Sequence, residues 1–143
     1  MFTFLLISSV YISIIDLASH KIRNRTLIVV GIGLSAITVI VNGQFYLLSA
    51  LAAFLLGSLA ISCGLGAGDV KLATLLSLFF LPLEISRWSE LCISFVVACV
   101  LLLFIHLVSR KSIAEPIALA PAICAAFISV SYTHLTLPTN REV

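Results

Sequence analysis

Long runs of apolar residues, separated by short polar segments, cover most of the chain. A helix needs about 20 predominantly apolar residues to cross the hydrocarbon core of a bilayer. Six runs reach or approach that length, at residues 1–17, 27–42, 45–65, 72–86, 90–109 and 116–129. Helices satisfy their own backbone hydrogen bonds, whereas strands this long and apolar would leave backbone groups unpaired in lipid. The pattern predicts an all-α integral membrane protein with about six transmembrane helices.

The composition supports a membrane protein and excludes several other classes. The chain has 143 residues, of which 62% are hydrophobic and 10% charged, whereas a soluble domain is about half apolar and a quarter charged. A soluble domain, a disordered chain and a disulfide scaffold are therefore excluded. The net charge of +2 gives no support to a nucleic-acid partner. The lipid bilayer is the partner that the composition predicts, and the oligomeric state stays open.

Residues 130–143 differ abruptly in composition from the apolar run before them. The string from Val130 to Thr139 resembles the translation of a transposon-end sequencing adapter, and the last four residues fit the index and adapter bases that follow. Such segments are set aside before the fold is considered. We therefore interpret 1–129 as one membrane domain whose sixth span is truncated, and 130–143 as a tail that is not native.

The charges in the loops predict the orientation. Alternate loops carry six basic residues against one, which is Arg87; the six are Lys21, Arg23, Arg25, Lys71, Arg110 and Lys111. Because basic loops stay in the cytoplasm, these three loops are expected inside and the N-terminus outside. The expected location is a bacterial-type inner membrane, crossed several times.

Two aspartates lie at the ends of predicted spans on that cytoplasmic side. Asp16 ends the first span and Asp69 opens the fourth. Ionisable groups at membrane depth are costly, which makes them candidates for function. Two facing carboxylates can share a proton, so that one draws a proton from water and the other acts as an acid toward a carbonyl. Solvated carboxylates at helix ends explain the spacing equally well.

Two glycines precede the second aspartate, in Gly66-Ala67-Gly68-Asp69. Glycine permits positive φ and close backbone approach. Irregular backbone at membrane depth is tolerated where it lines a wet cavity. A substrate strand could therefore approach the carboxylate of Asp69, although glycine also punctuates ordinary loops.

The segment Gly66-Ala67-Gly68-Asp69-Val70-Lys71 resembles the G-x-G-D-x-K motif of the type IV prepilin peptidases, a family of membrane aspartic proteases. The segment from Asp16 to Asn24 is similar to the family's first motif, an Asp and a basic stretch followed by Ile-Pro-Asn, with Arg23 in place of the proline. A weaker similarity covers 117–122, where Ala118 replaces a usual proline. The resemblance extends over nearly all of residues 1–129.

The resemblance implies a function for these residues. Asp16 and Asp69 would be the catalytic pair, and Gly66, Gly68, Lys71 and Asn24 would support the two motifs. The substrate would be a prepilin or pseudopilin with a short basic leader, cleaved at the cytoplasmic membrane face. Larger family members add a domain with paired cysteines and methylate the new N-terminus. No C-x-x-C pair occurs here, so the chain resembles the short, peptidase-only branch, and no methyltransferase activity is expected.

Other roles remain open for several residues. Lys71 could tune the carboxylate or simply anchor a helix end at the interface, and Asn24 could support the site or cap the second helix. His20 and His106 lack metal-ligand spacing, and the four cysteines lie in apolar runs without a C-x-x-C pair. We therefore expect no metal and no cofactor.

Two other functions fit the pair of aspartates. A different G-x-G-D intramembrane protease, of presenilin-like type, is less favoured because Lys71 and the pattern from Asp16 to Asn24 match the prepilin peptidases. A small proton-coupled transporter could use the two carboxylates as a relay, although the chain shows no repeated halves. A non-catalytic assembly factor with vestigial carboxylates is a further class. Loss of cleavage on Asp→Asn change would separate the enzymes from the last two.

Overall fold

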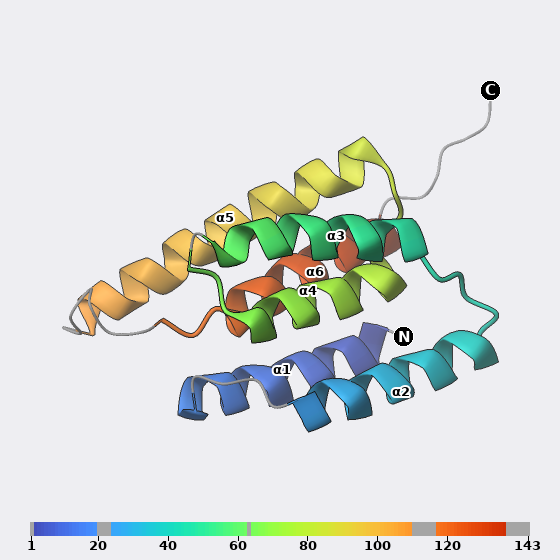
Figure 1. Cartoon of the computed structure of the whole chain (residues 1–143), viewed down its shortest axis with the longest axis horizontal. Helices are drawn as coiled ribbons and strands as arrows, with labels where there is room; N and C mark the ends of the chain where they lie inside the picture. The colour runs from blue at the N-terminus through green and yellow to red at the C-terminus, as the bar shows by residue number, and fades with distance from the viewer. Residues whose placement is uncertain (1, 20–23, 63, 110–116, 137–143) are drawn as a thin grey trace.

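The computed structural model describes residues 2–19, 24–62, 64–109 and 117–136. Within these residues the backbone forms six α-helices and no strand, and successive helices run in alternating directions (Figure 1). They are α1 (Phe2–Ser19), α2 (Asn24–Ile40), α3 (Leu47–Ile61), α4 (Ala67–Phe80), α5 (Ile85–Val108) and α6 (Ala120–Thr136). The expected all-helical fold and its six elements are therefore present.

Two of the expected boundaries are wrong. α4 begins at Ala67, five residues before the apolar run that starts at 72, so Lys71 lies on a helix and not in a loop. The turn expected near 87–90 is helical, and its Arg87 donates to Glu90 at 3.2 Å within α5. The break between these helices falls earlier, because Pro82 disfavours helical backbone at Leu81, which is extended.

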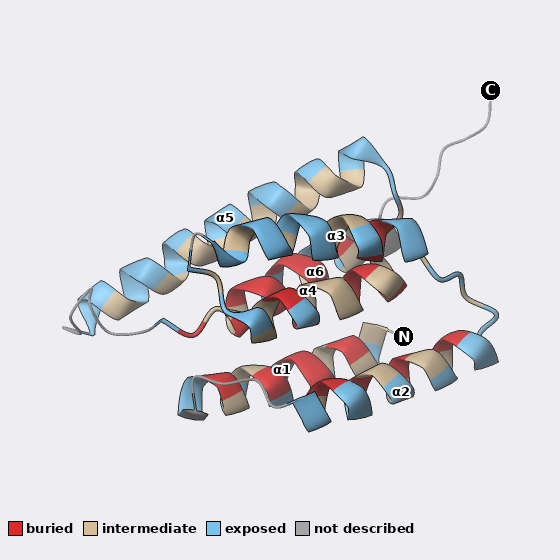
Figure 2. Ribbon diagram, viewed as in Figure 1, coloured by how far each residue is buried: buried red, intermediate tan, exposed pale blue. Residues whose placement is uncertain are grey.

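Two pairs of helices meet at the centre of the bundle, and the two N-terminal helices pack against them. α3 packs on α4 and α5 packs on α6, while α4 and α6 contact each other. α1 packs against α6, and α2 against α4 and α1. The core lies between α1, α2, α4 and α6, where buried residues face one another (Figure 2). Leu5, Leu34, Leu72 and Ala120 are fully buried there. The helices that carry Asp16 and Asp69 thus belong to the best-packed part of the molecule.

The outer surface of the bundle is apolar. α5 has no buried residue, and large apolar side chains such as Ile85 and Ile40 are 92% and 79% exposed. A water-soluble monomer rarely exposes contiguous apolar patches of this extent. α5 has 24 residues and is long and apolar enough to cross a membrane. Four shorter apolar helices accompany it among the described residues, in α1, α2, α3 and α6.

One end of the bundle collects the elements that carry the sequence motifs. The last residues of α1, α3 and α5 and the first residues of α2, α4 and α6 lie at this end (Figure 1). Lys71 and Arg25 lie near it on α4 and α2. The other basic residues of the orientation argument, Lys21, Arg23, Arg110 and Lys111, fall outside the described residues, as does Cys63. We call this the motif end.

The sixth helix continues past residue 129. α6 runs to Thr136, and Val130 is 3% exposed in the core. The ring of Tyr132 lies 6.4 Å from that of Phe2. The segment 130–136 therefore folds as a helical extension, while the interpretation of 130–143 as an adapter-derived tail stays a prediction about the origin of the sequence.

Candidate active site

Asp16 is a buried carboxylate held against the start of another helix. It lies in the last turn of α1 and is 5% exposed. Its Oδ2 accepts a hydrogen bond of 3.1 Å from the backbone N–H of Ala120, the first residue of α6. The first N–H groups of a helix lack acceptors within the helix, and this end carries a partial positive charge. The amino end of α6 thus positions the Asp16 carboxylate.

Asp69 is positioned by the glycine-rich entry to α4. It lies in the first turn, and its N–H donates to the carbonyl of Gly66 at 3.0 Å. A Cβ on Gly66 would lie 2.8 Å from Oδ2 of Asp69. Gly64 has φ of +97°, which non-glycine residues rarely adopt. The backbone at Gly64 therefore favours glycine, and a side chain at Gly66 would displace the carboxyl group of Asp69. Gly68, one position before Asp69, is half-buried in the same turn.

The two aspartates line one cavity at the motif end. Its volume is about 330 Å³. The two aspartates contribute its acidic groups, and the remaining wall consists of Gly64, Leu65, Gly66, Ile117, Ala118 and Leu119. Three segments far apart in the sequence therefore meet: the end of α1, the entry to α4 and the entry to α6. The cavity leaves room for a water molecule and a peptide backbone beside the two carboxyl groups.

Asp69 shares its surroundings with a second carboxylate. It is half-buried in the first turn of α4 and lines the same cavity as Asp16. Two carboxyl groups in one partly buried cavity do not both ionise easily, because burial and a like charge both disfavour ionisation. The pair can therefore share one proton.

Lys71 and Asn24 lie outside this cavity and pair with each other. Lys71 Nζ donates to Asn24 Oδ1 at 3.1 Å. Both side chains are exposed, and the bond joins the start of α2 to α4. They also line an apolar groove of about 930 Å³ between these helices. The pair connects the two sequence motifs, and in the described part of the chain neither side chain hydrogen-bonds to Asp16 or Asp69, which supports a role in holding the helix ends together.

The sequence matches one known family. A model of the type IV leader peptidase family matches residues 3–108, which include both aspartates, Lys71 and Asn24. The chain belongs to the type IV leader peptidase family. No curated protein and no solved structure matches it. The resemblance drawn from the two motifs is thus confirmed at the level of the family, and the chain is a leader-peptidase-like protease.

The leader-peptidase match ends before α6, although α6 completes the cavity. The sequence alone indicated a weak similarity of residues 117–122 to the family, but it predicted no function for them. The structure shows that Ile117, Ala118 and Leu119 form a wall and that Ala120 contacts Asp16. Pro121 was the available signal, because proline favours the first turn of a helix. The part played by Gly64 was also missed.

The described residues contain no group of three or more His, Cys, Asp or Glu side chains placed to hold a metal ion. The cavity offers two carboxylates and apolar or glycine walls. This arrangement is chemically suited to acid–base work on a bound water molecule, with one carboxylate charged and the other protonated.

Proposed function

We propose that this leader peptidase is a membrane aspartic endopeptidase that removes the short basic leader of type IV prepilins or pseudopilins. One observation carries the proposal. Asp16 and Asp69, on α1 and α4, line the same cavity, and Asp16 also accepts an N–H from the amino end of α6. Family membership supplies the protease class.

The two environments suggest separate roles for the carboxylates. Asp16, whose Oδ2 accepts the Ala120 N–H, would take a proton from water through its other oxygen. The resulting hydroxide oxygen bonds to the scissile carbonyl carbon, and Asp69 gives its proton to the carbonyl oxygen. Collapse of this tetrahedral species breaks the C–N bond: the proton held by Asp16 passes to the leaving amine, and Asp69 takes back a proton from one hydroxyl group as the new carboxyl group forms. Each carboxyl group thus serves once as base and once as acid over the cycle.

We further propose that all six helices cross the membrane, with the N-terminus outside and the cavity at the cytoplasmic face. Alternating helix directions and an apolar outer surface support this arrangement. Lys71 and Arg25 at the motif end agree with the excess of basic residues in cytoplasmic loops. A basic leader would remain in the cytoplasm beside the cavity, while the apolar segment after it lies in the bilayer.

Co-expression with a tagged prepilin tests this function. We expect the full chain to shorten the prepilin after the last residue of its leader, as read by gel shift and mass spectrometry. Asp16→Asn and Asp69→Asn should each abolish the product, because an amide can neither accept nor supply the required proton. Glu84→Gln is the matched control, since Glu84 is an exposed acid at the opposite end of the bundle.

The outcome also separates the protease from the alternative function. Intact prepilin in the presence of membrane-inserted wild-type protein would contradict the proposal. Proton-coupled flux that disappears with the same two Asp→Asn changes would then favour a transporter in which the carboxylates form a relay.

A further inference from the structure

A second cavity begins where the first one ends. It has a volume of about 270 Å³ and lies between the α3–α4 pair and the α5–α6 pair. Leu65 and Asp69 line both cavities. We call this second cavity the α3–α5 cleft. The proposed acid of the reaction therefore stands at the junction between the catalytic cavity and the cleft.

The helix packing explains why the cleft is open toward the outside of the bundle. Among the described residues α3 packs only on α4, and α5 packs only on α6. α4 and α6 contact each other and form the floor, while α3 and α5 form the walls, whose backbones do not approach each other closely among the described residues. Leu56 on α3 and Cys92 on α5 are exposed and line the cleft. In a bilayer this opening would face the lipid chains.

The walls of the cleft are almost entirely apolar. Ala73, Phe95 and Phe127 are among the lining residues. The cleft extends along α4 from Asp69 to Ser77, and eight residues of helix span about 12 Å. This length matches about two turns of a helix or three to four residues of an extended strand. The cleft can therefore hold a short stretch of apolar polypeptide next to the carboxyl group.

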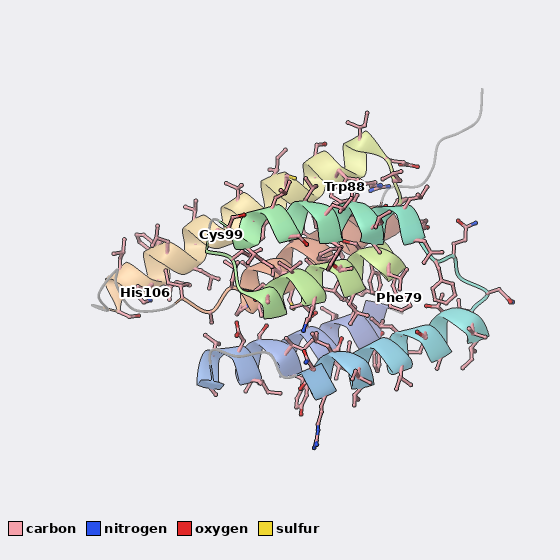
Figure 3. All side chains as sticks on the ribbon, in the orientation of Figure 1. Phe79, Trp88, Cys99 and His106 are labelled. Carbon is pink, nitrogen blue, oxygen red and sulfur yellow. The ribbon has the colours of Figure 1, made fainter. Side chains whose placement is uncertain are left out.

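Trp88 places a polar N–H group in the cleft, at the end far from Asp69. Its indole lines the cleft near the start of α5, between α5 and α3 (Figure 3). Its Nε1 is shielded from solvent and has no acceptor among the described residues. Indole N–H groups usually find a hydrogen-bond partner when buried. A main-chain carbonyl of a polypeptide in the cleft would be such a partner.

We propose that the α3–α5 cleft holds the apolar segment that follows the scissile peptide bond and that this segment enters sideways from the bilayer between α3 and α5. The inference rests on the proposed function and adds a binding subsite to it. Continuity with the catalytic cavity at Asp69 and Leu65 points to a substrate segment as the occupant. The apolar walls match the side of the substrate that lies in the membrane, and the basic leader extends away from Asp69 toward the cytoplasm.

Cysteine cross-linking tests which residues meet in the cleft. Cys92 stays as the single cysteine after Cys63, Cys99 and Cys124 are replaced by alanine, and Asp16→Asn keeps the substrate intact. The probe is a membrane-anchored prepilin with one cysteine placed at successive positions over the first two turns after the scissile bond. We expect disulfides between these positions and Cys92 on oxidation. The control enzyme carries Cys92→Ala and Ile93→Cys, which moves the cysteine to a neighbouring position where Ile93 is 65% exposed. We expect no disulfides to the substrate in this control.

Equal cross-linking at both enzyme positions would overturn the proposal, because it would indicate random encounters in the membrane. Disulfides between two copies of the protein through Cys92, with none to the substrate, would also overturn it and would identify the cleft as a self-association surface. Cys92 can also be treated with a maleimide in phospholipid vesicles, with and without the substrate. Equal protection from the reagent in both cases would likewise overturn the proposal, because it would show that lipid occupies the cleft.

A kinetic comparison separates this inference from the proposed function. Cys92→Trp would fill the opening, and Ile93→Trp is its matched control on the lipid side. We expect Cys92→Trp to lower kcat/KM on the anchored prepilin about tenfold or more, since a docked apolar side chain loses its burial. A soluble leader peptide that ends shortly after the scissile bond makes few contacts in the cleft, so its loss with Cys92→Trp should be several-fold smaller than that of the anchored prepilin. An equal loss on both substrates, or no loss on either, contradicts the inference. Absence of cleavage by the wild type contradicts the proposed function instead.

Discussion

Asp16 and Asp69 line one cavity but are stabilised by different groups. Asp16 is 5% exposed and accepts the N–H of Ala120. Asp69 lies beside Gly66 and shares the cavity with the like charge of Asp16. At the scale of single residues, the site can therefore hold one negative charge and one proton, which is the state that water activation requires.

A side chain at position 66 should disturb the carboxylate of Asp69 by steric contact. In Gly66→Ala the new Cβ would lie 2.8 Å from Oδ2 of Asp69, so that the carboxyl group must move. We expect a loss of roughly ten- to hundredfold in kcat, because small displacements of a catalytic group are costly. Circular dichroism should show unchanged helix content. Ala67→Ser changes the exposed neighbouring residue and should retain activity; an equal loss in both variants would refute the steric explanation.

At the scale of helices, the site depends on how α6 and α4 begin. At the start of α6 the N–H of Ala120 donates to Asp16. α4 is the shortest of the described helices, with 14 residues. Fourteen residues span about 21 Å, whereas the hydrocarbon core is about 30 Å thick. In the proposed transmembrane arrangement α4 would be shorter than the hydrocarbon core, a mismatch that local thinning of the bilayer can accommodate.

The contact between α1 and α6 predicts a difference between two substitutions of Asp16. Asp16→Ala leaves the N–H of Ala120 buried without an acceptor, since Ala120 is fully buried, and this should cost about 1–3 kcal/mol of stability. Asp16→Asn retains a side-chain oxygen that can accept the bond. We expect a lower thermal midpoint in detergent for the alanine variant than for the asparagine variant, with both inactive. Identical midpoints would show that the bond does not stabilise α6.

At the scale of the whole molecule, the alternating helices bring both aspartates to one end, with Lys71 and Arg25 close by (Figure 1). The proposed orientation follows from this arrangement and from the basic loops. The opposite end includes the turn between α2 and α3, where Asn42 has φ of 51° and no charged residue occurs between 41 and 46.

The orientation predicts which cysteines a membrane-impermeant maleimide can reach. In a background without native cysteines, Gln44→Cys in the α2–α3 turn should be labelled from outside intact cells. Arg25→Cys, at the motif end, should react only after the membrane is permeabilised. Both positions are exposed in the structure, so that burial does not explain a difference. The reverse pattern would place the active site outside the cytoplasm.

Much of this architecture could be predicted from the sequence. The apolar runs predicted six helices, and the two motifs predicted the family and the aspartates that line the cavity. These features are local, since they depend on runs and spacings. The hydrogen bond from Ala120 to Asp16 and the pairing of Lys71 with Asn24 could not be predicted, because they join helices distant in sequence. The early start of α4 was missed because hydropathy does not register the polar first turn of a helix.

The central claim is that Asp16 and Asp69 act as one catalytic unit, and a double-mutant comparison tests it most directly. Purified wild type, Asp16→Asn, Asp69→Asn and the double variant are compared for cleavage of an anchored prepilin, with inserted protein matched by amount. We predict that each single change removes about as much activity as both together, because the effects of residues that act as a unit are strongly non-additive. Activity that survives in either single variant, or losses that simply multiply, would contradict a shared-proton dyad.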